Sequence, residues 1–285
     1  MGGTRSPREA LRKLGLRPRK GLGQHFLVNQ DVADRIVRAA LDEEPDGVVE
    51  IGPGLGILTE RLAASGLPVV AIEKDEAMRP PMEEIQGGHP NLQVRYEDVL
   101  EADLAQLTSG GAWVAIGNVP YQITSPLLEK LLTTEPPFKA IVVTVQKEVG
   151  ERLCAQPGTK QYGALTLLAQ FYADEPGIVC SLAPGSFYPP PKVNSVAVKM
   201  LPKCQPPLAE EDREGFFVLV RAAFGQRRKQ LRNALSVVGE LWLTRAQVQE
   251  ALRAAHIEPR RRGETLSLEE FLTLTEAVRQ VDAGG

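Results

Sequence analysis

Short runs of β-branched and other apolar residues alternate with longer amphipathic stretches over the first two thirds of the chain. Five of these runs predict buried strands, at residues 48–51, 69–72, 92–96, 114–116 and 141–145. The segments between them are long enough for crossover helices, which neighbouring parallel strands require. The pattern therefore predicts βαβ units and a mainly parallel sheet.

Two later runs and one leading helix complete this predicted domain. Residues 178–180 and 195–200 predict two further strands that form a hairpin at one edge of the sheet. Apolar residues recur at helical spacing over residues 31–40, so a helix precedes the first strand. We therefore expect an α/β domain with a seven-stranded, mainly parallel sheet over residues 21–201.

The pattern changes after Leu201. A proline-rich stretch follows and marks a linker. The remaining sequence has helical periodicity, and two of its helices begin with capping-box sequences at Thr244 and Ser267. We expect a small all-α domain over residues 208–285, and we treat residues 1–20 as a separate basic arm.

Composition limits the classes of protein to consider. With 285 residues and 43% hydrophobic content, the chain can bury the core of one large domain and one small one. It has no run of about 18 apolar residues and no apolar block of a secretory signal, so we expect a soluble cytoplasmic protein without a membrane partner. Its three widely spaced cysteines predict reduced thiols and no metal site.

Basic residues gather locally although the net charge is −3. One cluster lies in the arm of residues 1–20, a second at residues 221–232 and a third at residues 260–262. Such patches suit contacts with phosphates, and they equally suit solvated helix faces and a frayed terminus.

The first predicted strand leads into a glycine-rich turn at residues 50–56, with Gly52 and Gly54 among its members. Glycine allows the backbone to turn tightly and to approach a ligand closely. A dinucleotide fingerprint would need a further glycine or alanine where Ile57 or Thr59 stands. The order acidic-x-G-x-G-x-G instead resembles the first motif of class I (Rossmann-like) methyltransferases, whose cofactor is S-adenosylmethionine.

Acidic residues close the first three predicted strands. Glu73 ends the second strand, where a carboxylate can accept hydrogen bonds from both ribose hydroxyls of a nucleoside cofactor. Asp98 follows the third and can accept from the cofactor's adenine amino group. Each acid alone could be a solvated strand end. With Glu50, they place three acids at the carboxyl ends of successive strands, which favours a cofactor site.

The segment Asn-Val-Pro-Tyr at residues 118–121 follows the fourth strand. One reaction that such a segment can serve is methylation of the exocyclic amine of adenine, N6. This amine is a poor nucleophile, so an enzyme must hold it with its lone pair facing the methyl group of the cofactor. The Asn118 side-chain oxygen and the Pro120 carbonyl suit this task, and Tyr121 can stack on an extruded base. The segment could also be a plain tight turn.

Phe187, in a proline-rich loop, is a second candidate base clamp or part of an ordinary strand connection.

Several motifs in order carry a resemblance to a known family. They occupy residues 21–27, 50–56, 118–121, 146–149, 162–163, 187–193 and 223–233. Together the chain resembles the KsgA-type small-subunit ribosomal RNA adenine dimethyltransferases. The resemblance implies dimethylation of two adjacent adenines near the 3′ end of 16S rRNA during small-subunit assembly, with S-adenosylmethionine as the methyl donor and no metal, and we expect a monomer.

The resemblance also implies residue roles. The family's cofactor positions fall on His25, Leu27, Gly52, Glu73, Asp98 and Asn118, and the glycine turn adds Gly54. His25 stands where many relatives carry asparagine, which leaves its side-chain role open. A basic helix would contact rRNA phosphates through Arg227, Arg228, Lys229 and Arg232.

Three alternatives remain at this point. A large-subunit rRNA methyltransferase of the antibiotic-resistance type shares the cofactor motifs, but the segment 223–233 argues against it. A DNA adenine methyltransferase would use the same tetrapeptide, because that chemistry does not read the sugar. A non-catalytic ribosome assembly factor could keep the fold as a scaffold, and the intact acids and Asn118 argue against a loss of catalysis.

Overall fold

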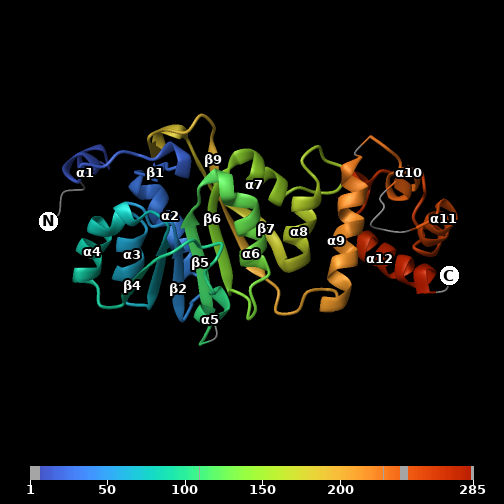
Figure 1. Ribbon diagram of the computed structural model, residues 1–285, viewed down its shortest axis with the longest axis horizontal. Helices are drawn as coiled ribbons and strands as arrows, with labels where there is room; N and C mark the ends of the chain where they lie inside the picture. Colours follow the sequence, from blue (N-terminus) through green and yellow to red (C-terminus); the bar gives the residue numbers. More distant parts are fainter. Residues whose placement is uncertain (1–6, 109, 227, 238–242, 284–285) are drawn as a thin grey trace. The chain divides into compact units, whose positions relative to one another are not determined.

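The computed structural model describes residues 7–108, 110–226, 228–237 and 243–283 of the chain (Figure 1). By internal contacts the chain divides into two compact units. The first combines the residues up to 150 with residues 173–204, and the second combines residues 151–172 with the residues from 205 onward.

A seven-stranded sheet forms the centre of the first unit, in the order β4-β3-β2-β5-β6-β9-β7. The first five of these strands pair in parallel, whereas β9 runs antiparallel to both β6 and β7. The predicted mainly parallel sheet with a late hairpin at its edge is therefore confirmed. The strands are β2 Gly47–Ile51, β3 Val69–Glu73, β4 Leu92–Tyr96, β5 Trp113–Asn118, β6 Ala140–Gln146, β7 Ala173–Leu182 and β9 Ser195–Pro202.

Helices connect and cover these strands (Figure 1). All residues of β2 and β3 are buried, which explains why, apart from Glu50 and the terminal Glu73, both strands have continuous apolar sequences instead of alternating ones. The leading helix α2 buries Ala33, Ile36 and Ala40 in the same core as the sheet, as its spacing predicts. The helices are α2 Gln30–Leu41, α3 Thr59–Ala64, α4 Arg79–Gly88, α5 Leu104–Thr108, α6 Thr124–Leu132 and α7 Lys147–Leu153.

A short antiparallel pair holds the N-terminal region on the first unit. Strand β1 (Phe26–Leu27) pairs with β8 (Phe187–Tyr188), which lies in the loop between β7 and β9. Leu11, from helix α1 (Pro7–Lys13), packs with Phe26 and Met78 in a small cluster. The single-turn helices of this unit are η1 Lys20–Leu22, η2 Glu76–Met78, η3 Tyr121–Ile123 and η4 Pro184–Ser186.

The second unit is helical. Its α-helices are α8 Ala164–Tyr172, α9 Glu210–Gly225, α10 Leu231–Ala234, α11 Arg245–Ala254 and α12 Leu268–Ala283, with η5 Leu235–Val237 and η7 Gly263–Thr265 between them. Both capping boxes form: Thr244 accepts from the Gln247 N–H at 3.2 Å, and Ser267 accepts from the Glu270 N–H at 3.3 Å. Within the described ranges, no helix combines the length and apolarity needed to cross a membrane.

Residues 151–172 belong to this second unit, although the sequence groups them with the sheet. The reason is an aromatic cluster: the Phe171 ring centroid lies 4.7 Å from that of Phe216 and 5.1 Å from that of Phe217. The Tyr162 hydroxyl also donates to the Leu266 carbonyl at 2.8 Å. The assignment of separate functions to residues 1–20, 21–201 and 208–285 stays a prediction.

Candidate active site

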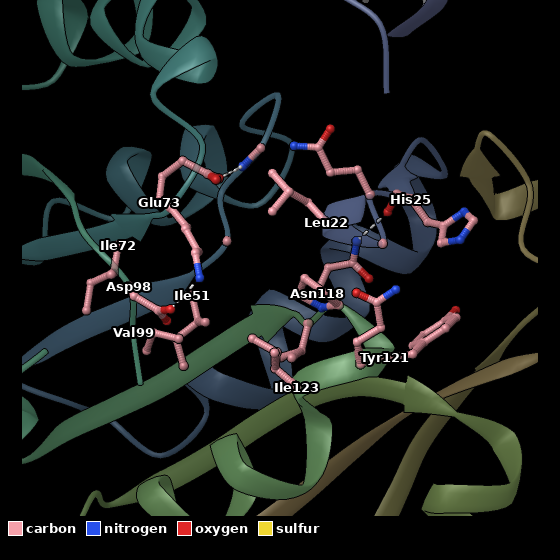
Figure 2. Close-up of a pocket in the computed structure, with 18 of the residues that line it drawn as sticks. Leu22, His25, Ile51, Ile72, Glu73, Asp98, Val99, Asn118, Tyr121 and Ile123 are labelled. Atoms are coloured by element: carbon pink, nitrogen blue, oxygen red, sulfur yellow. Dashed lines mark hydrogen bonds and ion pairs between the residues drawn. The ribbon is translucent and has the colours of Figure 1, made fainter. Parts of the chain in front are cut away.

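A pocket lies at the carboxyl ends of the parallel strands, where the crossing connections of such sheets leave space for ligands (Figure 2). Glu73 and Asp98 lie on one side of it, and Asn118, His25 and Tyr121 lie on the other. The N-terminal segment of residues 21–26 supplies a wall. The predicted site residues that line the pocket are His25, Gly52, Gly54, Glu73, Asp98, Asn118, Pro120 and Tyr121.

The glycine turn after β2 requires its glycines. Gly52 and Gly54 have φ values of +66° and +57°, a region that side chains strongly disfavour. A Cβ atom on Gly54 would lie 2.9 Å from a ring carbon of Phe26. The turn therefore brings bare backbone to the pocket, which suits the close approach of a ligand.

Glu73 ties this turn to the end of β3. One carboxylate oxygen accepts the Gly54 N–H at 3.1 Å, and the other accepts the Asp75 N–H at 2.8 Å. The residue is 7% exposed, and burial raises its pKa above the usual value while the backbone hydrogen bonds oppose that rise. Each oxygen keeps a further lone pair, so Glu73 can still accept from ligand hydroxyls.

Asp98 lines the pocket beyond the end of β4. It forms an ion pair with Lys74 at 2.5 Å and accepts the Leu100 N–H at 3.0 Å. These contacts lower the pKa of Asp98, and the hydrogen bond from Lys74 contributes most to this shift. The carboxylate is therefore charged near neutral pH. The Lys74 side chain is 62% exposed, so this pair is screened by water and leaves Asp98 able to accept from a ligand amine.

Asn118 ends β5 with its side chain oriented. Its Nδ2 group donates to the main-chain carbonyl of His25 at 2.8 Å, which leaves its side-chain oxygen as a hydrogen-bond acceptor. The Pro120 carbonyl accepts the Ile123 N–H at 3.2 Å and retains one lone pair. Two acceptors are thus available on the turn that follows β5.

The His25 side chain contacts groups that the sequence did not predict. Its Nδ1 lies 2.7 Å from the Pro189 carbonyl, which can only accept, so Nδ1 carries the proton. Its ring stacks on that of Tyr121, with centroids 5.8 Å apart. The Tyr121 hydroxyl in turn lies 2.6 Å from the hydroxyl of the buried Ser195. Pro189 and Ser195 therefore hold the side chains of His25 and Tyr121 in place, and no sequence motif marks this role for either.

Two predicted site residues lie away from the pocket. Leu27 and Phe187 are 4% and 3% exposed, pair with each other in the β1 and β8 ladder, and belong to the main core. In this conformation the Phe187 ring packs inside the protein, so a base clamp at this position would require the loop to move. The clamp role stays a prediction.

The predicted basic helix has a different structure. Arg228 and Lys229 lie in the turn between α9 and α10, not on a helix, because Gln230 is extended (φ −68°, ψ 150°) and caps α10. Arg232 lies on α10, and the side chains of all three are exposed. Arg227 lies outside the described residues.

Glu50, inside β2, has the most strongly perturbed carboxyl group near the site. It is 1% exposed, and one of its oxygens has no hydrogen-bond partner among the described residues. Burial, together with the neighbouring Glu73 charge, raises its pKa from 4.5 to about 8. The side chain is therefore largely neutral at pH 7, in contrast to Asp98.

The Glu50→Gln variant tests this protonation state. Between about pH 4.5 and 8 the folded protein holds a proton that the unfolded chain releases, so the free energy of unfolding falls as pH rises, by up to about 1.4 kcal/mol per pH unit. Glutamine is neutral throughout, so we expect a flatter profile and a more stable protein at pH 8. Urea unfolding from pH 5 to 9 measures this. Glu60→Gln, on the exposed face of α3, should keep the wild-type slope, and parallel curves for Glu50→Gln and wild type would contradict the assignment.

Comparison with known proteins gives one consistent result. The family described as "Ribosomal RNA adenine dimethylase" matches residues 15–279. "Ribosomal RNA small subunit methyltransferase A" of Moorella thermoacetica is 42% identical over 278 residues, which cover 94% of this chain and 95% of that protein. The protein with the same description from Geobacillus thermodenitrificans is 41% identical, over 95% and 94% of the two chains.

Solved structures agree with this result. A dimethyladenosine transferase from Plasmodium falciparum has a TM-score of 0.75 and 28% identity, and covers 90% of this chain and 98% of its own. The 23S rRNA methyltransferase ErmE has a TM-score of 0.68 and 26% identity, and covers 90% and 100%. The predicted Rossmann-like methyltransferase fold is thereby confirmed.

Proposed function

The chain belongs to the ribosomal RNA adenine dimethylase family, and we propose that it transfers methyl groups from S-adenosylmethionine to N6 of two adjacent adenines near the 3′ end of 16S rRNA. The observation that carries this proposal is the Asn118 side chain. Its amide nitrogen is held by the His25 carbonyl, so its oxygen is positioned to accept a hydrogen bond inside a pocket that suits a nucleoside cofactor.

The pocket has the groups that S-adenosylmethionine requires. The bare backbone at Gly52 and Gly54 accepts close approach of the ligand, Glu73 suits the ribose hydroxyls, and Asp98 suits the adenine amino group. When bound, S-adenosylmethionine supplies a methyl group on a positively charged sulfur. A buried carboxylate such as Glu73 favours a ligand of this charge as well as its hydroxyls.

The target amine is oriented by acceptors, not by a base. The Asn118 oxygen and the Pro120 carbonyl accept the two N6 hydrogens, which turns the nitrogen lone pair towards the methyl group. Tyr121 stacks on the extruded adenine, and its ring is held by Ser195 and His25. An amide cannot act as a general base, so the proton on the methylated nitrogen is lost to water.

The RNA contact is expected to be electrostatic. Arg228, Lys229 and Arg232 form an exposed cationic cluster in the second unit, and the arm of residues 1–20 carries further positive charge. Phosphate contacts of this kind weaken as salt rises. Helical RNA hides its base edges, so recognition by shape around an extruded adenine fits these surfaces. We propose that a cytoplasmic monomer binds the small ribosomal subunit in this way.

A large-subunit substrate is the second candidate, favoured by the fold shared with ErmE. The identity to that protein is 26%, against 42% to a relative whose printed name specifies the small subunit. The difference supports the small-subunit substrate.

One experiment separates these candidates. The protein is incubated with radiolabelled S-adenosylmethionine and either unmethylated small subunits, large subunits or duplex DNA, and the nucleosides are then analysed. We expect labelled N6-methylated adenosine from small-subunit RNA alone. Label confined to large-subunit RNA or to DNA would overturn the proposal, and the absence of label in all three would favour a binding role.

A further inference from the structure

A buried carboxylate two residues beyond Glu73 has no role in the mechanism above. The Asp75 side chain is 1% exposed and accepts three hydrogen bonds. Arg19 donates through Nη1 at 2.8 Å, Gln24 donates through Nε2 at 2.8 Å, and the Ala77 N–H donates at 3.1 Å. Two of these donors come from the N-terminal segment, more than fifty residues away in sequence.

Gln24 lies in the segment of residues 21–26, which forms one wall of the pocket, and Arg19 lies just before this segment. The segment folds on itself, because the Arg19 N–H donates to the Gln24 side-chain oxygen at 2.9 Å and the Leu22 N–H donates to the Arg19 carbonyl at 3.1 Å. In Figure 2, Leu22 and His25 of this wall lie across the pocket from Asp98. A residue that binds both Arg19 and Gln24 therefore also fixes the position of this wall.

The other side of Asp75 connects to the cofactor site. Its N–H donates to one oxygen of Glu73 at 2.8 Å, and the second oxygen of Glu73 accepts the Gly54 N–H. A continuous series of hydrogen bonds therefore links the glycine turn, Glu73, Asp75 and the N-terminal wall. Asp75 joins the two sides of the pocket, because its main-chain N–H contacts Glu73 and its carboxylate contacts the N-terminal wall.

We propose that Asp75 is a positioning residue that clamps the wall of residues 21–26 over the cofactor pocket through Gln24 and the adjoining Arg19, and that this clamp sets the affinity for S-adenosylmethionine. The inference rests on the proposed function in that it takes S-adenosylmethionine as the ligand. Phe26 pairs with Tyr188, and Leu11 packs beside it, so the wall has a second attachment. Loss of the clamp should loosen the wall without unfolding the protein.

The two donors should contribute unequally. The Arg19 side chain is 59% exposed, so water screens its ion pair. The Gln24 contact is partly buried, and its removal leaves a buried carboxylate oxygen without a donor. Asp75→Asn keeps an oxygen for the Ala77 N–H but can turn an NH₂ group against Gln24, which tests the clamp while preserving the local turn.

The test uses the full-length protein. Calorimetric titration with S-adenosylmethionine and steady-state kinetics are measured for Gln24→Ala, Asp75→Asn, Arg19→Ala and Arg19→Lys. We expect Gln24→Ala and Asp75→Asn to raise Kd and KM for the cofactor about tenfold, with kcat and the KM for RNA changed less than about twofold. Arg19→Ala should raise the Kd for the cofactor by a smaller factor, and Arg19→Lys should retain most of the cofactor affinity because it keeps the ion pair.

Arg17→Ala is the matched control, since it removes the same charge from an exposed position two residues away. It should bind the cofactor as the wild type does. Equal losses in Arg17→Ala and Arg19→Ala, or wild-type affinity in both Gln24→Ala and Asp75→Asn, would overturn the clamp. If the wild type itself fails to bind S-adenosylmethionine, the proposed function fails, whereas a binding wild type with unaffected variants refutes the clamp alone.

Discussion

Asn118→Ala is expected to reduce kcat for methyl transfer by about 100- to 1000-fold, the loss seen when one preorganised hydrogen-bonding group is removed from an active site. The variant lacks the oxygen that orients the target amine, so the N6 lone pair no longer faces the methyl group for most of the time. Single-turnover transfer to unmethylated small subunits measures the loss. Binding of the subunits, measured separately, should change less than about twofold.

Gln122→Ala provides a matched control for this variant. It removes a side-chain amide from the same turn, at an exposed position that also lines the pocket. We expect transfer to remain within about threefold of the wild type. Because the Asn118 Nδ2 group holds the His25 carbonyl, cofactor affinity must be measured as well. Equal losses of cofactor binding, subunit binding and transfer in Asn118→Ala would mean that the residue is structural.

The strands could be predicted from sequence because their burial is simple. A parallel strand covered on both faces is almost continuously apolar, as in β3, whose predicted and observed ends agree to within one residue. The edge strand β4 alternates instead, with apolar Leu92 and Val94 separated by polar Gln93, and this pattern also predicts its ends. Strands β1 and β8 have two residues each and offer no such pattern. Their pairing buries Phe187, and for this reason a residue predicted to face a ligand lies in the core.

The boundary between the two units illustrates a second limit. One limit of the second unit, after residue 204, falls in the proline-rich stretch, but residues 151–172 join this unit through the packing of Phe171 on Phe216. That contact joins residues more than forty positions apart, and the helix that carries Phe171 looks like any other crossover helix in the sequence. Local patterning therefore places the elements but does not assign each to its core.

The functional site also contains some residues that the sequence predicts and others that it does not. Glu73, Asp98 and Asn118 could be proposed from sequence because the ends of parallel strands meet at one edge of a sheet. The residues that hold the surrounding pocket wall could not, because Asp75, Pro189 and Ser195 act through contacts with Gln24, His25 and Tyr121 in distant segments. Ion pairing also changes the pKa of a predicted residue. Asp98 forms an ion pair with Lys74, which lowers the pKa of the carboxyl group, and strand order alone does not reveal this contact.

Glu73→Gln is expected to raise the KM for S-adenosylmethionine about 100-fold while kcat at saturation changes much less. A carboxylate accepts from the Gly54 and Asp75 N–H groups at once, whereas an amide presents one oxygen and one NH₂ group, so one buried N–H must lose its acceptor. Ribose hydroxyls lose acceptor capacity in the same step. Calorimetric titration measures the affinity, and Glu76→Gln, at a side chain that is 75% exposed, is the matched control and should bind normally.

The pH dependence of cofactor binding gives this variant a second, independent readout. Only the ionised Glu73 carboxylate accepts at both oxygens, and burial raises its pKa above that of a free carboxyl group. The wild type should therefore lose affinity as pH falls, and it should begin to do so at a higher pH than an exposed glutamate would. Glu73→Gln has no proton to gain there and should lack this loss. If the variant keeps both the wild-type affinity and the wild-type acid limb, Glu73 does not bind the ribose.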